Sequence, residues 1–346
     1  MTAQPTLWMR HESRFRERRA PLTPADAAAL VADGMRVVVE ESPARVFTDE
    51  EYEAAGCLIA PAESWPDAPE GAIVLGLKEL PPGETPLRDH IFFGEAFDSE
   101  KGSDRLLRRF STGGGTLYDL ETLVDADGRR LASFSYWGGY LSAALAVFEA
   151  RRELPRALRP TDRASLDHAL ATGAGDGLRA VVTGAKGRSG RGACDALAVA
   201  GVATTRWDVD ETRDIDTAAL LDHDILVNAA RPTGPCQPFL VGDDLDRPDR
   251  RLSVISEALP TVSRRYGLVP LYHELTTCDS PVRELRGGSR PVRLIAVDNL
   301  VTLLPREAST DYSAELRPLL ATLPDGQVWQ RAREEFWRHA PSLLAV

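Results

Sequence analysis

The most informative stretch of the sequence is Ala180-Val-Val-Thr-Gly184-Ala-Lys-Gly187-Arg-Ser-Gly190-Arg-Gly192. Apolar residues run into a glycine-rich turn, and a helix-like segment follows over residues 193–200. This order is typical of a dinucleotide-binding turn, in which glycines let the backbone bend and approach a pyrophosphate. The N–H groups at the start of the following helix attract the negative charge. The turn therefore predicts a cofactor site that includes Gly184, Gly187, Ser189 and Gly190.

An acidic residue lies where the ribose of a dinucleotide is expected. A second strand-like segment, residues 202–207, ends at Asp208, which follows Gly184 by 24 residues. A carboxylate at this place hydrogen-bonds ribose hydroxyls and repels a ribose phosphate. The sequence thus favours NAD over NADP, although Arg206 and Arg213 keep the second choice open. The spacing is GxxGxxG rather than GxGxxG, so the signal depends on the strand, helix and acid that accompany the turn.

Composition narrows the class of protein. The chain has 346 residues, about the length of two ordinary domains. Its net charge of −11 disfavours a nucleic-acid partner, which needs a basic surface. It shows no long apolar run and no signal-like N-terminus, so we expect a cytoplasmic protein with no membrane partner. The four cysteines lack metal-type spacing, so we expect reduced thiols and no metal.

Strand-like and helix-like segments alternate, which predicts an α/β fold with parallel sheets. Thr23-Pro24-Ala25-Asp26 is typical of a capped helix start, and Gly34 of its end. Residues 151–177 indicate a helix followed by a glycine-containing loop. Strands are predicted over residues 37–39, 72–77, 180–183, 202–207, 224–230, 251–256 and 292–297.

The first half of the chain contains an arginine-rich stretch from Trp8 to Pro24. It holds Arg10, Arg14, Arg16, Arg18 and Arg19 against Glu12 and Glu17. Such a cluster is either a solvated basic face or a set of fork-shaped donors for substrate carboxylates. Both readings stay open from the residues alone.

Two further stretches contain candidate catalytic or ligand-binding residues. Lys78 and Glu79 follow an apolar strand at its carboxyl end, where α/β proteins bind ligands. A partly desolvated lysine there could exchange protons with an amine, although a surface lysine is the plainer alternative. Gly113-Gly-Gly115 precedes another strand-like segment, which indicates either a close backbone approach or an ordinary turn.

Together these stretches resemble the lysine-forming, NAD-dependent saccharopine dehydrogenase family, which is related to alanine dehydrogenase. The resemblance is carried by Trp8-Met-Arg10, Arg19-Ala-Pro-Leu-Thr-Pro24, Leu77-Lys-Glu-Leu-Pro81, Gly113-Gly-Gly-Thr-Leu-Tyr-Asp-Leu-Glu121, Gly128-Arg-Arg130, the glycine turn, Trp207-Asp208 and Leu303-Leu-Pro-Arg-Glu-Ala-Ser309. It implies two Rossmann-like domains with a cleft between them. Residues 1–134 plus 306–346 would form the substrate and catalytic domain, and residues 135–305 the NAD-binding domain.

The resemblance also implies an activity and roles for individual residues. Family members oxidise a secondary amine to an imine with NAD and hydrolyse it to an amino acid and a 2-oxo acid, or run the reverse condensation. Lys78 matches the family's catalytic lysine, which handles the proton of the substrate amine. The matched substrate contacts are Arg19 and Arg130 for carboxylates, Glu79 and Glu121 for the amino half, and Phe134 as an aromatic neighbour. The matched NAD contacts are Gly187, Arg188, Asp208, Thr212 and Val297-Asp298-Asn299-Leu300.

The chain departs from the family at the reacting centre. Where the family has its second catalytic residue, a histidine, this chain has Glu95, and His90 matches an earlier histidine that does not fill the gap. Glu95 could act as a base towards water only if burial disfavoured its charged form; otherwise it would bind a positive group of a different substrate. Glu257 begins a run that replaces the family's Asp-Val-Ser-Ala-Asp, and Asn299 replaces a histidine.

These departures leave several functions open. The leading hypothesis is a saccharopine dehydrogenase-like enzyme whose amino-acid and 2-oxo-acid substrates differ from the usual pair, or which reduces a preformed imine or hydrazone. The first alternative is an alanine dehydrogenase-like enzyme that acts on a small primary amine. The second is a catalytically silent NAD-binding protein with a regulatory role.

Overall fold

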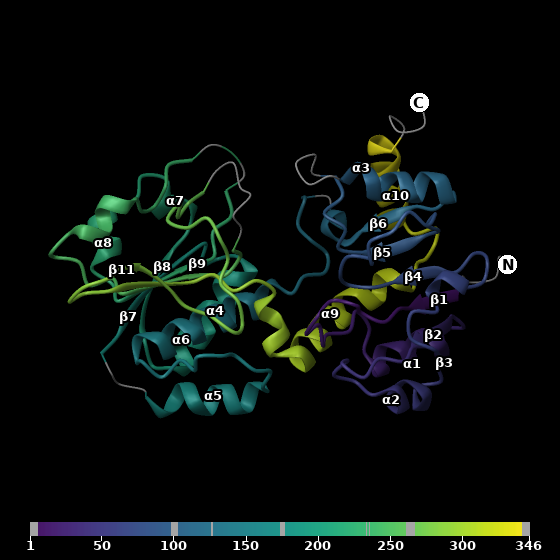
Figure 1. Cartoon of the computed structure of the whole chain (residues 1–346), viewed down its shortest axis with the longest axis horizontal. Coiled ribbons are helices and arrows are strands. Elements are labelled where there is room, and N and C mark those ends of the chain that lie inside the picture. Colours follow the sequence, from purple (N-terminus) through teal and green to yellow (C-terminus); the bar gives the residue numbers. More distant parts are fainter. Residues whose placement is uncertain are drawn as a thin grey trace. The chain divides into compact units, whose positions relative to one another are not determined.

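The computed structural model describes residues 6–97, 103–125, 127–173, 177–232, 234, 236–260 and 267–340. The chain divides into two compact units, one made of the described residues up to Ser133 and from Pro305 onward, the other of Phe134–Leu304. In Figure 1 the yellow C-terminal helix α10 lies with the blue strands of the first unit. No helix in the described part of the chain is long and apolar enough to cross a membrane.

The first unit contains a six-stranded sheet in the order β3-β2-β1-β4-β5-β6, with every neighbouring pair parallel. Its strands are β1 (Thr6–Met9), β2 (Arg36–Glu40), β3 (Leu58–Ala60), β4 (Ile73–Leu75), β5 (His90–Phe92) and β6 (Leu117–Asp119). Its helices are α1 (Pro24–Ala32), α2 (Asp49–Ala54), α3 (Ser103–Gly113), α9 (Pro305–Leu320) and α10 (Gln327–His339). Because β1 lies between β2 and β4, the strand order changes direction there, and ligands of α/β sheets bind at such points.

Local sequence explains the ends of α1. The Thr23 hydroxyl accepts a hydrogen bond from the Asp26 amide at 3.2 Å, and Gly34, at φ 92°, follows the last turn. The predicted helix is therefore confirmed. At the other end of the unit, Trp329 of α10 is fully buried and its ring meets that of Tyr118 edge to face at 5.7 Å, which fixes α10 against β6.

The second unit also contains a six-stranded sheet, in the order β11-β12-β10-β9-β7-β8. Its strands are β7 (Arg179–Thr183), β8 (Ala203–Trp207), β9 (Ile225–Asn228), β10 (Val254–Glu257), β11 (Arg283–Arg286) and β12 (Val292–Ile295). Its helices are α4 (Ser135–Ala150), α5 (Arg163–Thr172), α6 (Arg188–Val199), α7 (Val209–Thr212) and α8 (Thr217–Leu221). Five strands are parallel, as predicted, whereas β11 pairs antiparallel with β12. The strand order changes direction between β7 and β9, which makes their carboxyl ends the expected ligand edge.

One predicted helix begins later than expected. The helix predicted within residues 151–177 is α5, which starts only at Arg163. Pro155 and Pro160 precede it, and a proline disfavours helical geometry at the residue before it. Asp162 then caps the helix by accepting a hydrogen bond from the Ser165 amide at 2.9 Å.

Helix α4 was not predicted, although it shapes the second unit. It buries every residue from Trp137 to Val147, so its sequence shows no polar face and no helical period. A Cβ on Gly139 would lie 1.8 Å from the Ser189 carbonyl oxygen, and one on Gly192 would lie 2.0 Å from the Tyr136 carbonyl oxygen. These glycines let α4 and α6 pack backbone against backbone. Figure 1 shows α4, α5 and α6 on one face of this sheet and α8 on the other.

Candidate active site

The glycine turn has the shape that the sequence predicts. Gly184 follows β7 with φ 67°, and Gly187 is the N-cap of α6. A Cβ on Gly190 would lie 2.1 Å from the Gly184 carbonyl oxygen, and one on Gly184 would lie 2.8 Å from the Ala229 carbonyl oxygen. The obstructing atoms belong to the backbone and cannot move aside. Larger residues would therefore force this turn open.

The start of α6 suits a negatively charged group. The first N–H groups of a helix have no partner within the helix and attract anions. Ser189, in this first turn, is 4% exposed, and its hydroxyl has no hydrogen-bond partner in the described part of the chain. A buried polar atom without a partner indicates a missing ligand or water. Arg188, half-buried, is the first residue of the helix. This end of α6 fits the pyrophosphate of a dinucleotide.

Asp208 lies beside the glycine turn. One of its carboxylate oxygens accepts a hydrogen bond from the Lys186 amide at 2.7 Å, and the other accepts one from the Val209 amide at 2.9 Å. The Asp208 amide donates to the Glu211 carboxylate at 2.8 Å, and the Thr212 hydroxyl donates to the Asp208 carbonyl at 2.7 Å. Two predicted cofactor contacts, Asp208 and Thr212, are thus brought next to the turn.

The remaining predicted cofactor contacts follow β12. The carboxyl ends of parallel strands meet at the same edge, so residues 297–300 lie at the edge that carries the glycine turn. Val297 is buried and bridges to Thr276, and the Asp298 amide donates to the Thr276 carbonyl at 3.3 Å. Asn299 has φ 55°, a left-handed conformation, and precedes η5 (Leu300–Leu303).

A row of buried polar side chains at the same edge was not predicted. The Thr183 hydroxyl donates to the Asn228 side-chain oxygen at 2.7 Å, and the Asn228 amide group donates to the Glu257 carboxylate at 3.0 Å. These residues end the neighbouring strands β7, β9 and β10. The sequence feature that could have predicted this row is a polar residue at the end of each apolar strand. Glu257, one of the departures from the family, thus ends a hydrogen-bonded row that joins three strands.

In the first unit, a buried ion pair holds the backbone of Lys78. The Glu12 carboxylate accepts hydrogen bonds from the Leu77 amide at 2.6 Å and from the Lys78 amide at 3.0 Å. Arg10 pairs with Glu12 at 3.5 Å and donates to the Lys78 carbonyl. Burial raises the pKa of Glu12, although the charge of Arg10 opposes the shift. Lys78 is therefore held at the carboxyl end of β4 by charged groups that are themselves buried.

Arg19 is also buried, and Glu17 holds it. Two guanidinium nitrogens of Arg19 donate to the two Glu17 carboxylate oxygens at 2.8 and 2.7 Å, and the Arg19 amide donates to one of them at 3.0 Å. Both side chains are under 5% exposed. The solvated-face interpretation of the arginine-rich stretch is therefore wrong for Arg10 and Arg19. The fork of Arg19 is pre-oriented by a carboxylate.

A single buried carboxylate organises the segment that carries Glu95. Asp119 accepts hydrogen bonds from the Gly94 and Ala96 amides, both at 3.1 Å, and from the Glu121 amide at 3.0 Å. Between these anchors, Glu95 has φ 45° and is exposed. Burial raises the pKa of Asp119 to about 6, although the hydrogen bonds from the Ala96 and Gly94 amides oppose this shift; the charges of Glu95 and Arg130 have smaller, opposite effects. Asp119, which was not predicted, thus sets the backbone of two predicted site residues.

Helix α9 contributes the other side of this site. Ser309 accepts a hydrogen bond from the Ala20 amide at 2.9 Å, so α9 holds the chain next to Arg19. Tyr312 is fully buried, and burial raises its pKa while the nearby charges of Arg19 and Arg130 oppose the shift. Arg19 and Arg130 therefore share one neighbourhood. Tyr312 was not predicted, because it lies far from both arginines in the sequence.

The other predicted substrate residues are distributed differently. Arg130 forms an ion pair with Glu121, and each side chain is 27% exposed. Glu79 is 66% exposed and pairs with Arg14 at 3.5 Å. Phe134 belongs to the second unit, where it precedes α4.

His90 does not supply the missing histidine. It is buried against the rings of Trp65, Phe92 and Phe110, and burial lowers its pKa to about 3. One ring nitrogen is within hydrogen-bond distance of the Arg88 carbonyl at 2.8 Å. His90 is therefore a neutral core residue.

Fold and site define an α/β protein with a dinucleotide-type turn in one unit and a lysine, arginines and buried carboxylates in the other. Residues 8–141 match the family model for the N-terminal domain of alanine dehydrogenase/PNT. The chain is 37% identical to saccharopine dehydrogenase (NAD(+), L-lysine-forming) of Neurospora crassa, in an alignment of 358 positions that covers 96% of each chain. It is 36% identical to the protein of the same name from Yarrowia lipolytica, over 98% of each chain. The chain belongs to the saccharopine dehydrogenase family, as its motifs predicted.

Solved structures confirm the fold. An L-alanine dehydrogenase superposes with a TM-score of 0.68 at 17% identity, covering 98% of each chain. A transhydrogenase from Sinorhizobium meliloti superposes with a TM-score of 0.62 at 20% identity, covering 92% of this chain and 94% of that one. Both matches extend over the two units.

Proposed function

We propose that this chain is an NAD-dependent oxidoreductase that acts on the C–N bond of a secondary amine joining an amino acid to a 2-oxo-acid carbon. The observation that carries the proposal is Lys78, whose backbone is held by the buried Arg10–Glu12 pair at a ligand edge of the first sheet. A lysine whose backbone is fixed in this way starts its side chain from a defined point, which suits general acid–base catalysis because that chemistry requires a defined geometry.

The second unit would hold the cofactor. Gly184, Gly187, Arg188, Ser189 and Gly190 would receive the pyrophosphate, and Asp208 the ribose hydroxyls, with Thr212 and residues 297–300 close by. The bound nicotinamide would supply the hydride chemistry. The domain of residues 135–305 would thus bind NAD, and the domain of residues 1–134 with 306–346 would bind the substrate.

The first unit would bind and protonate the substrate. Lys78 would hold or release the proton at the amine nitrogen. Arg19 and Arg130 would bind carboxylates, because a guanidinium carries five N–H donors, and one carboxylate, such as the Glu17 that holds Arg19, engages only two of them. Glu121 forms an ion pair with Arg130, so it would position that arginine. Together with Glu79, it would also bind the positively charged amino group of the amino-acid part of the substrate. Phe134 would be the aromatic neighbour.

Glu95 supports a substrate other than saccharopine. Its side chain is exposed, at the position where the family has its second catalytic histidine. An exposed acidic side chain suits contact with a positive substrate group, or a reaction without imine hydrolysis, such as reduction of a preformed imine or hydrazone.

The alternatives are less well supported. An alanine dehydrogenase-like reaction on a small primary amine needs fewer carboxylate-binding groups than Arg19 and Arg130 provide. A silent regulatory protein would have no use for the buried charges that hold Lys78, because burying charge is costly. The partners would be small amino acids and oxo acids rather than nucleic acid or membrane, and we expect a cytoplasmic location.

The test is NADH oxidation by the purified chain with lysine plus 2-oxoglutarate, beside a panel of other amino acids, 2-oxo acids and preformed imines. We expect turnover with at least one pair or imine other than lysine with 2-oxoglutarate. With the substrates that are turned over, Glu95→His should increase incorporation of solvent oxygen into the oxo acid, whereas Glu95→Gln should not. NADH binding with no turnover across the panel would contradict the proposed function.

A further inference from the structure

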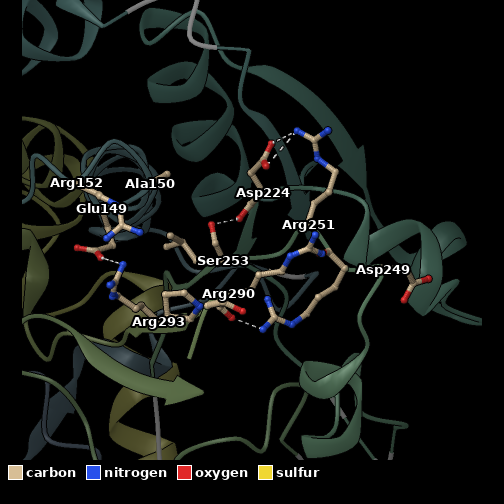
Figure 2. Close-up of a pocket in the computed structure, with 13 residues that line it drawn as sticks. Glu149, Ala150, Arg152, Asp224, Asp249, Arg251, Ser253, Arg290 and Arg293 are labelled. Atoms are coloured by element: carbon tan, nitrogen blue, oxygen red, sulfur yellow. Dashed lines mark hydrogen bonds and ion pairs between the residues drawn. The ribbon is translucent and has the colours of Figure 1, made fainter. Parts of the chain in front are cut away.

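A cavity lined by arginines lies in the second unit at the amino-terminal edge of its sheet, opposite the glycine turn. It has a volume of about 460 Å³ and opens where β9, β10 and β12 begin, next to the end of α4. Five arginines line it: Arg152, Arg250, Arg251, Arg290 and Arg293. Its acidic lining residues are Glu149, Asp224 and Asp249 (Figure 2).

The three acids are already engaged. Asp224 accepts two hydrogen bonds from Arg251 at 2.9 and 3.1 Å, and Glu149 pairs with Arg293 at 3.1 Å (Figure 2). Asp249 accepts two hydrogen bonds, at 3.0 and 3.3 Å, from Arg247, which does not line the cavity. These pairs neutralise Arg251 and Arg293 and leave three lining arginines to be balanced.

Arg250 is a buried cation in this cavity wall. It is 7% exposed, and its guanidinium donates to the carbonyls of Leu245 at 2.6 Å, Leu252 at 2.8 Å and Arg290. Among the described residues, no carboxylate oxygen lies within 4.0 Å of it. Burial and the neighbouring charge of Arg290 lower the pKa of Arg250, while Asp246, which pairs with Arg286, opposes the shift. A buried charge without an opposite charge is unfavourable, so an anion here would stabilise the fold.

Two further guanidinium groups line the same space. Arg290 is fixed by a hydrogen bond from its Nη1 to the Pro248 carbonyl at 2.6 Å. Arg152 follows α4 with φ 62°. In the described ranges neither guanidinium has a carboxylate oxygen within 4.0 Å. Several donors of Arg250, Arg290 and Arg152 therefore remain available to a bound ligand.

We propose that this cavity binds a doubly charged oxyanion, the phosphoryl group of inorganic phosphate or of a phosphomonoester. Guanidinium groups match the oxygens of phosphate with paired, charge-assisted hydrogen bonds. The cavity and the glycine turn lie at opposite edges of the same sheet, so this ligand would bind together with the dinucleotide. The proposal does not depend on the reaction proposed above.

The test is isothermal titration calorimetry of the full chain with inorganic phosphate at constant ionic strength, with NADH present to occupy the glycine turn. We expect saturable binding at one site. The double variant Arg152→Gln/Arg290→Gln should weaken it by about tenfold or more. The matched control is Arg105→Gln/Arg331→Gln, which removes the same charge from exposed positions of the first unit and should leave the affinity unchanged. Circular dichroism of each variant checks that it is folded.

Three results would overturn the proposal: the absence of saturable binding, equal weakening in both double variants, and displacement of NADH by phosphate. Titration with glycerol 3-phosphate separates the two sources of the ligand. Tighter binding than that of inorganic phosphate assigns the site to a phosphomonoester, and equal or weaker binding assigns it to inorganic phosphate.

Discussion

The ligand edges of the two sheets are built in opposite ways. At the first edge, the buried carboxylates of Glu12, Glu17 and Asp119 hold backbone amides and arginines. At the second edge, glycines bring backbone segments together, as Gly184 and Gly190 do in the turn after β7. The structure of the first edge therefore depends on buried charges, and that of the second edge depends on close contacts between backbone segments. Removing one charge should damage the first, whereas adding one methyl group should damage the second.

The largest effect on stability is expected at Glu12. Replacing it with Gln removes the charge that Arg10 meets and one of two acceptors for the Leu77 and Lys78 amides. Breaking a buried ion pair from one side costs about 3–5 kcal/mol. Urea unfolding should show this loss, and Glu53→Gln, at an exposed position of α2, should change stability by less than about 0.5 kcal/mol. A small loss for Glu12→Gln would mean that charge does not maintain the first edge.

The next effect is expected at Gly190. In Gly190→Ala the new methyl group would meet the Gly184 carbonyl oxygen and the Ala185 backbone, which cannot yield. We expect NADH affinity to fall about 100-fold, roughly 3 kcal/mol, measured by NADH fluorescence. Gly187→Ala is the comparison, because its Cβ would meet only the Gly184 carbonyl oxygen at 3.3 Å and should cost much less. Equal losses in the two variants would show that backbone shape is not what the turn requires.

A smaller, pH-dependent effect is expected at Asp119. Its pKa in the folded protein, about 6, is above the ordinary value near 3.9, so the folded state binds this proton more tightly. The stabilisation that the protonated Asp119 gives to the folded state is fully present below about pH 4. It is lost as pH rises through 6, which changes the free energy of unfolding by about 2–3 kcal/mol. Asp119→Asn should remove this dependence of stability on pH. The stability of the variant relative to wild type should therefore improve from about pH 4 to 7.

Urea unfolding across this pH range measures the difference. Asp67→Asn, at an exposed position, should keep the wild-type slope. Parallel pH profiles for Asp119→Asn and wild type would show that Asp119 is not the titrating group that holds the Glu95 segment.

The second edge was more predictable from sequence than the first, for a physical reason. A backbone turn needs glycines at fixed spacing, so Gly184, Gly187 and Gly190 indicated its place directly. A buried carboxylate such as Asp119 acts on amides that are distant in sequence, and no local pattern identifies it. Tyr312 was missed for the same reason.

The helices show the same contrast. Helix α1 has a cap, a proline and a terminal glycine that are all local signals, and it was predicted. Helix α4 is buried on every side and contains two consecutive glycines, so neither period nor propensity indicated it. The roles of the predicted site residues stay predictions until variants are measured.

The Lys78→Met variant, studied with the substrate pair that gives the highest turnover in the panel, shows whether the first edge performs the chemistry. If the first edge performs the chemistry and the second binds the cofactor, turnover should fall by about 10²–10⁴-fold while NADH affinity stays at the wild-type value. A joint fall of NADH affinity and turnover, or turnover that survives the change, would contradict the division of work between the two edges.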